Sequence, residues 1–516
     1  MKRRSFLKHT FHAAAVPGVL GSMGFTLPAR RSMESLLRQA AETDKVLVMI
    51  FLDGGNDGLN TVVPLDRMSE LNSVRPRVVL EESELLPLAQ SEVGLHPSML
   101  KLSRLYEENR FQIIQNVGYP EQNFSHFRST DIWMSGSDAN EVVASGWMGR
   151  NLEQTFPGYP EGYPNDDLKD PLAVEIGYGS SLLFQGVTST TSVTVNSVDS
   201  FYELIDNVEQ EAPDTPAGDK LKYLRLIARQ SQQYGERIVE VAGNVNGHSP
   251  YPEGNYLADQ LKVVSKLIAG GSRTPVYMVR LGGFDTHDSQ VDSNHSEGFH
   301  AQLLTMLDDA IDAFVKDLEF HGTGDKVLGM TFSEFGRTVV SNASNGTDHG
   351  AAAPLFFFGN QVKGGVVGSN PVIDHHMRWE DNLAHQYDFR QLYASVMEQW
   401  FGLDTSRRNT VLFEDYSTVE IIGNGVIQPL GVTPETTLIA YPNPMNGVAT
   451  IRFEGDGSST LIELVDLKGQ KLKEIYRGTA RSGRNTLSFS SEDLASGRYF
   501  ITLRSEKKKE VFGVIK

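Results

Sequence analysis

Four short polar segments of the sequence contain carboxylate and imidazole side chains that suit metal binding. Their candidate ligands are Asp53, Asp285, His287, Glu334, Asp348 and His349. Carboxylate oxygens bind hard cations such as Ca²⁺ and Mg²⁺, and imidazole nitrogens bind Zn²⁺ and similar ions. Each segment alone also fits a turn or loop, because Gly, Asn and Asp are common in turns. Since all four adjoin apolar runs in one region of the chain, together they predict a metal-dependent site.

The composition limits the chemistry that such a site can perform. The chain has 516 residues and no cysteine, which excludes disulfides, thiolate zinc sites, iron–sulfur clusters and a cysteine nucleophile. It carries 65 acidic and 47 basic side chains, a formal net charge of −18. This balance argues against nucleic-acid binding, which requires clustered Lys and Arg. Any metal ion must therefore be held by His, Asp, Glu or other oxygen-bearing groups.

A hydroxyl and two guanidinium groups complete the candidate site. Ser125 lies near the expected start of a helix, where the helix dipole favours an alkoxide and a bound anion. The same position also suits a helix N-cap, and the two roles are compatible. Arg128 and Arg337 are candidate anion clamps, because a guanidinium matches a tetrahedral oxyanion bidentately. Each arginine fits a surface ion pair equally well.

Apolar runs and amphipathic stretches predict the elements that position these side chains. Strands are expected at residues 45–52, 111–117, 276–281, 327–332 and 355–358. Helices are expected at residues 223–242, 256–269, 299–321 and 389–401. Their alternation predicts an α/β domain with a mostly parallel central sheet and helices on both faces. Because ligands in such sheets bind beyond the carboxyl ends of the strands, we expect the polar segments to meet at one edge.

The first 29 residues have the composition of an export signal. A basic start that contains Arg3 and Arg4 precedes a mildly apolar stretch that is too short and too polar to span a bilayer. The arginine pair resembles a twin-arginine signal; the alternative is a frayed basic N-terminus. We therefore expect export and no transmembrane helix.

The C-terminal part of the chain predicts a second, smaller domain. Short alternating runs separated by Gly, Asn and Ser indicate a small β-sandwich. The expected division is residues 45–403 for the α/β domain, 404–435 for a linker and 436–516 for the sandwich. Its motifs at residues 441–444, 466–469 and 497–499 resemble the type A C-terminal sorting domain of the type IX secretion system of Bacteroidota. The resemblance implies the type IX machinery as a partner, with release to the cell surface or anchoring at the outer membrane; the alternative is an accessory sandwich that binds carbohydrate.

A set of motifs in the α/β region resembles the exported family called domain of unknown function 1501. The motifs lie at residues 52–57, 95–97, 125–128, 146–150, 284–287, 333–338 and 347–350. That family is grouped with the alkaline phosphatase and sulfatase superfamily. The grouping implies an alkaline-phosphatase-like core, two neighbouring divalent ions and a nucleophile that attacks phosphorus or sulfur.

The resemblance implies roles for the candidate ligands. Asp53 resembles the first-strand aspartate of the superfamily site, and Asp285 and His287 resemble the ligands of one ion. The stretch that begins at His349 is similar to that around the last metal histidine. Glu334 is followed by Phe335 where the superfamily has Asp-His, so one imidazole is missing or supplied elsewhere. The candidates to replace it are Asp348, His126, His375, His376 and His385.

The resemblance also implies the nucleophile. Ser125 precedes Ser135 and Gly136 much as superfamily nucleophiles precede a Thr-Gly pair. Ser129 and Thr130 are the alternative candidates for the nucleophile. A second ion held by fewer imidazoles would favour Ca²⁺, Mg²⁺ or Mn²⁺ over Zn²⁺, and a single ion is the alternative. The expected cofactor is thus one or two divalent ions, chosen from Zn²⁺, Ca²⁺, Mg²⁺ and Mn²⁺.

Two functions follow as expectations. The first is a secreted or cell-surface metal-dependent hydrolase of phosphate or sulfate esters, acting on an anionic small molecule or glycan. The second is a catalytically silent surface or matrix protein that keeps a metal or anion site on the same fold. A purely structural scaffold, the third possibility, predicts no stoichiometric metal.

Overall fold

The computed structural model describes residues 44–177, 179–195, 215–423, 438–441, 445, 447–465, 471–495, 497–505 and 509–516. The expected export signal at residues 1–29 lies outside the described residues, as do residues 442–444 of the first sorting motif and the second motif at 466–469. Among the helices that are described, none is long and apolar enough to cross a membrane.

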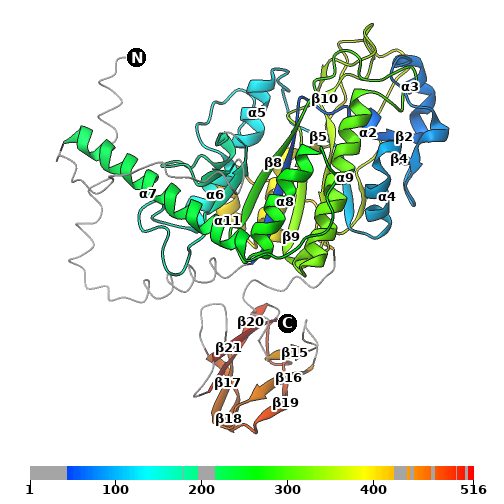
Figure 1. Cartoon of the computed structure of the whole chain (residues 1–516). Helices are drawn as coiled ribbons and strands as arrows, with labels where there is room; N and C mark the ends of the chain where they lie inside the picture. The colour runs from blue at the N-terminus through cyan, green and yellow to red at the C-terminus, as the bar shows by residue number, and fades with distance from the viewer. Residues whose placement is uncertain are drawn as a thin grey trace. The chain divides into compact units, whose positions relative to one another are not determined.

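A nine-stranded sheet forms the centre of the α/β domain (Figure 1). Its order is β13-β5-β12-β9-β1-β8-β6-β7, and β14 pairs with β5. The strands are β1 (Val46–Asp53), β5 (Phe111–Gly118), β6 (Ala173–Ile176), β7 (Ser192–Val195), β8 (Val276–Gly282), β9 (Val327–Phe332), β12 (Ala353–Phe358), β13 (Gly365–Val367) and β14 (Tyr387–Asp388). Only β12 runs antiparallel to its neighbours in this sheet. The predicted mostly parallel sheet is confirmed.

The central strand β1 is buried on both sides. Successive side chains of a strand point to opposite faces, and all but the last residue of β1 are buried. Val48 and Ile50 belong to one apolar cluster, whereas Leu47 and Met49 belong to a second. A nearly unbroken apolar run is what a strand between two such layers requires.

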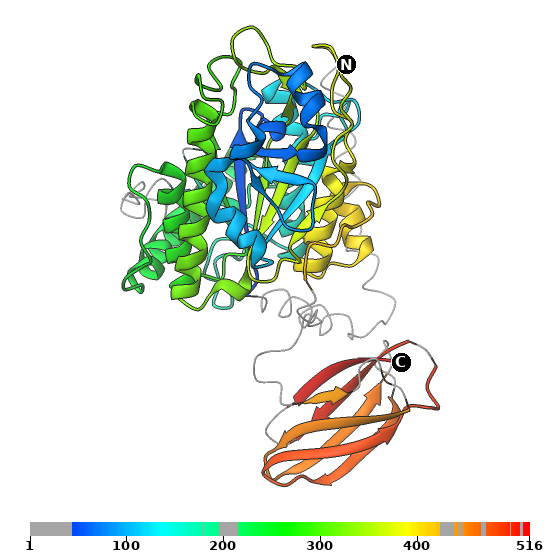
Figure 2. The ribbon, with the colours of Figure 1, turned by 90° about the vertical axis from the view of Figure 1, so that its right-hand side faces the viewer.

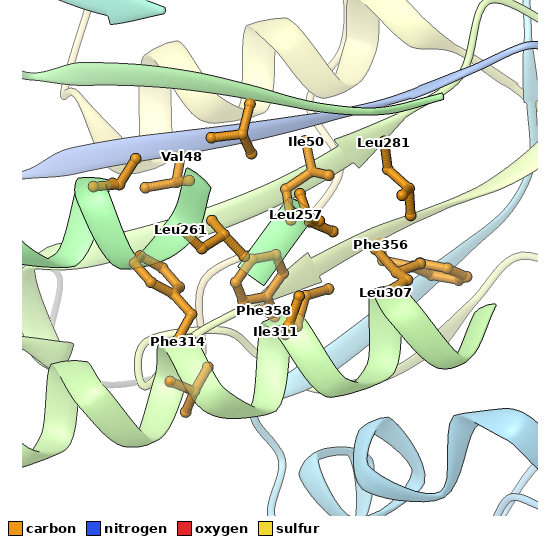
Figure 3. Packing of buried hydrophobic residues seen from close by; sticks show 14 of the residues in the cluster. Val48, Ile50, Leu257, Leu261, Leu281, Leu307, Ile311, Phe314, Phe356 and Phe358 are labelled. Carbon is orange, nitrogen blue, oxygen red and sulfur yellow. The ribbon is translucent and has the colours of Figure 1, made fainter. Parts of the chain in front are cut away.

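Helices cover both faces of the sheet. The first cluster draws on α4 (Leu100–Glu107), α8 (Tyr256–Ala269) and α9 (Phe299–Phe320). The second draws on α5 (His126–Ser135), α6 (Trp147–Thr155) and α10 (Phe389–Ser395). Figure 2 shows the green helices and the yellow helices on opposite sides of the strands. In Figure 3, Leu261 of α8 and Ile311 of α9 lie with Val48 and Ile50 in the first cluster.

The strand directions place the polar segments at one edge of the sheet. β8 and β9 run parallel to β1, so the carboxyl ends of these three strands lie together. β12 runs antiparallel to β9 and to β5. The amino end of β12 and the carboxyl end of β5 therefore lie at this same edge, and the segment before β12 reaches the site from the opposite chain direction.

The C-terminal strands form two small sheets around a core of their own. One has the order β15-β16-β19 and the other β18-β17-β20-β21. Their bounds are β15 (Ile439–Tyr441), β16 (Val448–Gly455), β17 (Ser459–Val465), β18 (Lys471–Thr479), β19 (Gly483–Ser490), β20 (Arg498–Arg504) and β21 (Lys509–Ile515). The core contains Ile451 from the first sheet and Leu464 and Ile501 from the second. This arrangement confirms the predicted small β-sandwich.

The segment expected to be a linker begins with a helix. Residues Thr405–Leu412 form α11, and the Asp404 side chain accepts a hydrogen bond from the Arg407 amide at its start. Val411 and Leu412 are buried in the second apolar cluster of the α/β domain. The structured domain therefore extends beyond residue 403, because two apolar side chains there complete its core.

Candidate metal centre

Four segments bring their side chains together at the edge of the sheet where β1, β8 and β9 end. The elements α5 and β10, which lie at this edge, are labelled in Figure 1. His126 is the first residue of α5, and Asp285 and His287 follow β8. Glu334 follows β9, and His349 lies in the short strand β11 (His349–Gly350). β11 pairs with β10 (Gly336–Arg337), which sets Arg337 opposite His349.

The Asp285 carboxylate is the centre of the cluster. Its Oδ1 lies 3.2 Å from the Nε2 atoms of both His287 and His349, and its Oδ2 lies 3.4 Å from Nε2 of His126. The Nε2 atoms of His287 and His349 are 2.9 Å apart. His126, Asp285 and His349 form a set of potential ligands whose donor atoms all lie within 4.8 Å of one another. Three imidazoles thus converge on one carboxylate.

The other nitrogen of each imidazole faces a hydrogen-bond acceptor. Nδ1 of His126 lies 2.8 Å from Glu334 Oε1, and Nδ1 of His287 lies 2.8 Å from Asp348 Oδ1. Nδ1 of His349 lies 2.7 Å from the carbonyl oxygen of Phe124. Carbonyl and carboxylate oxygens only accept, so each Nδ1 is the donor. In the neutral imidazoles each Nε2 therefore presents a lone pair to the cluster.

Lone pairs that face one another and a carboxylate at these distances are stabilised by a cation between them, either a proton or a metal ion. The Nε2 atom of His126 is buried and has no hydrogen-bond partner among the described residues. Histidine held through Nδ1 by a carboxylate or carbonyl is the usual arrangement at metal ions. With metal–nitrogen bonds of about 2.0–2.1 Å, tetrahedral ligands lie about 3.3 Å apart, close to the separations found here. The residues fit a divalent ion.

Glu334 supports the cluster by binding the Nδ1 atom of one of its imidazoles. Its side chain is fully buried, and it accepts hydrogen bonds from Nδ1 of His126 and, at 3.0 Å, from the amide of Gly54. This hydrogen bond raises the pKa of His126, so in the absence of a metal ion a proton is favoured at the same place. Glu334 therefore orients an imidazole instead of pointing its own oxygens at the common centre.

The guanidinium of Arg337 forms hydrogen bonds with several other groups of this protein. Its guanidinium donates to the carbonyl oxygens of Gly54, Gly55, Phe284 and Thr347 and, at 2.7 Å, to Oδ1 of Asp285. Burial tends to raise the pKa of Asp285, but the bond to Arg337 outweighs it and lowers the pKa. Arg337 keeps Asp285 ionised and ties together the loops after β1 and β8.

Asp53 lies at the rim of the cluster. Its Oδ2 accepts a hydrogen bond from Nη1 of Arg280 at 3.2 Å. Burial and the neighbouring Glu334 charge raise the pKa of Asp53. The Arg280 side chain is 47% exposed, so its guanidinium is accessible to solvent next to Asp53. An arginine inside an apolar run carries no sequence signal that it pairs with Asp53, so Arg280 could not be singled out from the sequence.

The hydroxyl candidates differ in exposure. Ser125 is exposed at the amino end of α5, and its side chain makes no capping hydrogen bond. Ser129 is buried, with its hydroxyl 2.7 Å from that of Tyr119 and bonded to the carbonyl of Glu334. Thr130 is partly buried. Arg128 donates to the carbonyls of Asp138, Ala139 and Glu141 in the segment after α5.

Comparison with known sequences places the α/β domain in a family. Residues 44–411 match the family described as "Protein of unknown function (DUF1501)". The chain belongs to this family. Residues 439–516 match the "Secretion system C-terminal sorting domain", which indicates export of this DUF1501 protein to the cell surface or beyond. A search of curated proteins found no match.

Solved structures that resemble this DUF1501 chain have low sequence identity. The structure of Ps i-CgsB in complex with k-i-k-neocarrahexaose has 10% identity and a TM-score of 0.34, covering 91% of this chain and 86% of that one. A protein in the alkaline phosphatase superfamily from Vibrio parahaemolyticus has 8% identity and a TM-score of 0.32, with 93% and 87% covered. The lipoteichoic acid synthase LtaP from Listeria monocytogenes has 8% identity and a TM-score of 0.28, with 86% and 92% covered. At such scores we infer function from the site alone.

Two further motifs of the DUF1501 set support the fold. A side chain at Gly146 or Gly149 would lie 2.1–2.4 Å from backbone atoms of residues 182–185, so both positions require glycine. Arg150 donates to the carbonyls of Ser135, Ser145 and Val411. His96 accepts a hydrogen bond from the amide of Ser98 at the start of a 3₁₀ turn.

Of the histidines considered as replacements, His126 enters the cluster. His375 and His376 are exposed in the segment before β14. His385 packs against the last residue of β5, Gly118. Its Cβ lies 3.1 Å from the position that a Cβ on Gly118 would take. The sequence signal for His126 was its place beside Ser125, in the segment that follows the β5 strand.

Proposed function

We propose that this protein is an exported, metal-dependent hydrolase of phosphate or sulfate esters. The observation that carries the proposal is the convergence of three imidazole lone pairs on the Asp285 carboxylate. The sorting domain supports action outside the cell. We further propose that the type IX machinery receives residues 436–516, and that residues 1–29 direct the chain across the inner membrane before it is released or anchored at the outer membrane.

The ligands proposed for the ion are His126, His287, His349 and Asp285. Imidazole-rich sets suit Zn²⁺ better than Ca²⁺, Mg²⁺ or Mn²⁺, so with His126 included we favour Zn²⁺. When bound, such an ion would polarise an ester oxygen and offset the charge of the substrate. Glu334 and Asp348 orient two of the imidazoles, and such supporting groups strongly affect metal affinity.

The reaction proposed for the remaining residues begins at Ser125. Its exposed hydroxyl adjoins His126 and lies at the positive end of α5, which favours an anionic substrate and an ionised oxygen. The oxygen loses its proton to solvent and bonds to phosphorus or sulfur while the ester bond breaks and the alcohol leaves protonated. Water then releases the inorganic anion and restores the hydroxyl. Arg280, which is exposed, takes the role of anion clamp, and Arg337 positions Asp285.

One observation favours the alternative, a surface protein that binds metal without turnover. Among the described residues, no base forms a hydrogen bond with the Ser125 hydroxyl, which also makes no capping bond. The two functions share the metal centre, so turnover is what separates them.

The test uses the exported chain with Zn²⁺ supplied. Wild-type protein is expected to retain about one ion per chain by elemental analysis and to cleave p-nitrophenyl phosphate or sulfate. His349→Ala is expected to lose the ion and the activity, whereas Ser125→Ala should keep the ion and lose turnover. The matched control is His248→Ala, since His248 is exposed and bonds only to a neighbouring carbonyl. A folded wild-type chain that retains no ion would contradict the proposal, and an ion without turnover would support the binding alternative.

A further inference from the structure

A buried polar network lies next to the loops of the metal centre. Its core is the ion pair between Asp57 and Arg75, whose side chains are 1% and 0% exposed. Asp57 also accepts from the amides of Leu59 and Asn60 at the start of a short helix. Arg75 outweighs the effect of burial and lowers the pKa of Asp57. The carboxylate is thus a fixed negative anchor inside the domain.

Gln290 connects this anchor to the loops that carry the ligands. Its Nε2 donates to Oδ2 of Asp57 at 2.6 Å. Its Oε1 accepts from the hydroxyl of Thr286 at 3.1 Å and from that of Thr347 at 2.7 Å. Gln290, Thr286 and Thr347 are all buried. Both polar atoms of this amide are therefore engaged, in bonds to Asp57, to Thr286 of its own loop and to Thr347 of the loop before β12.

The two threonines are placed directly beside ligands. Thr286 lies between Asp285 and His287, and Thr347 precedes Asp348 and His349 by one and two positions. Their segments also meet through the backbone, because the Thr347 amide donates to the Thr286 carbonyl at 3.2 Å. A shift of either threonine would change the spacing between His287 and His349, whose Nε2 atoms are 2.9 Å apart.

We propose that Gln290 is a positioning residue of the metal centre, tying both ligand loops to the Asp57–Arg75 pair. The inference rests on the proposed metal site and adds a residue that touches neither metal nor substrate. Because one amide oxygen binds both threonine hydroxyls, it couples the loop after β8 to the loop before β12. Replacing it with methionine keeps the volume but leaves two buried hydroxyls without their acceptor, which costs free energy unless the loops move.

The test compares Gln290→Met with Gln230→Met. Gln230 is a matched control because it is also buried and its Nε2 donates to two carbonyls, those of Pro160 and Tyr163, in another part of the domain. Competition against a zinc indicator is expected to show about a 10- to 100-fold loss of Zn²⁺ affinity in Gln290→Met, the usual effect of removing a supporting residue. Gln230→Met should keep the wild-type affinity even where its melting temperature falls. Equal affinity in wild type and folded Gln290→Met would overturn the inference.

A metal-free measurement separates this inference from the proposed function. Hydrogen exchange of the metal-free chain is expected to be faster in residues 283–290 and 343–350 of Gln290→Met, and unchanged there in Gln230→Met. Should wild type bind no Zn²⁺, the proposed function fails, while the exchange result still decides whether Gln290 holds the two loops in place. Unchanged exchange in Gln290→Met overturns the inference that Gln290 holds these two loops. Thr347→Val, which removes one hydroxyl and keeps the shape, serves in place of a Gln290→Met chain that does not fold and should show the same change to a smaller extent.

Discussion

At the metal centre, the direction of each imidazole is determined by the acceptor behind it. A glutamate, an aspartate and the carbonyl of Phe124 each bind one Nδ1 atom. Two of these acceptors, Glu334 and Asp348, had been expected as ligands, and one oxygen of each lies next to an imidazole nitrogen. The same residue types therefore serve two roles, either holding an ion or orienting the group that holds it.

Arg280 carries the prediction at this scale. Arg128 and Arg337 donate to backbone carbonyls, whereas Arg280 is exposed and bonds to Asp53. Arg280→Met is expected to raise KM for a charged ester about 10-fold or more, because a hydrogen bond to a charged group contributes about 1.5–3 kcal/mol. Zn²⁺ affinity should not change, which steady-state kinetics and metal titration together would establish.

The control for Arg280 lies in the other domain. Arg477 is 61% exposed and pairs with Glu474 in the C-terminal sandwich, so Arg477→Met removes a similar charge and should leave KM unchanged. An unchanged kcat/KM in Arg280→Met would rule out the clamp role.

At the scale of elements, the loop after β1 is shaped by close approach to the loop after β8. Gly54 has φ +122°, and a Cβ there would lie 2.4 Å from the amide nitrogen of Asp285. Its own amide donates to Glu334. Glycine is required at this position for its backbone angle and for its lack of a side chain.

Gly54→Ala is therefore expected to cost more than backbone strain alone. Gly271 also has positive φ, +92°, but nothing lies within 4 Å of a Cβ there, so Gly271→Ala measures the strain by itself, about 1–3 kcal/mol. In urea unfolding Gly54→Ala should lose clearly more stability than Gly271→Ala, and it alone should lose Zn²⁺ affinity. Equal losses in the two variants would show that the contact with Asp285 does not matter.

The antiparallel strand β12 matters at the same scale. It pairs with β9 in the reverse direction, so the residues before it reach the edge where parallel strands end. A ligand that precedes its strand can thus join ligands that follow theirs.

At the scale of the whole molecule, the described residues of each domain have apolar clusters of their own, and the α/β domain also holds a buried polar network. Among the described residues, the sandwich core draws on residues from 438 onward, and the α/β domain has its own clusters. Within the α/β domain, His300 is buried and donates from Nε2 to Asn56 Oδ1 at 3.0 Å. Burial lowers the pKa of His300 to about 4.

This shift predicts how stability depends on pH. The pKa of His300 is lower in the folded chain than the roughly 6.5 of an unfolded one, so its stabilising contribution is complete above that pH and is lost as pH falls toward 4. The loss by pH 4 is about 3 kcal/mol. His300→Gln should show a smaller decrease in free energy of unfolding between pH 7 and 4, measured by urea titration. Identical pH dependence in the variant and wild type would contradict it.

Much of the fold could be predicted from local patterns. Apolar runs such as residues 327–332 and the helical spacing of Leu304, Leu307 and Ile311 indicated strands and helices where the structure has them. The alternation of these strands and helices was enough to predict a mostly parallel sheet, because a strand buried on both faces appears in the sequence as a continuous apolar run. Helix α11 has no such signal in its sequence, because it is short and mostly polar.

The sequence by itself determined which segments adjoin the ends of strands, and with them most of the side chains that meet at the site. Only the tertiary structure decided which atoms face the common centre. His126 and Glu334 are 208 positions apart, and no spacing pattern reports a bond between side chains at that separation. The roles of Gln290, Arg280 and Arg337 likewise depend on partners brought near by the packing of loops, and hydrogen bonds are made between neighbours in space, whatever their distance along the chain.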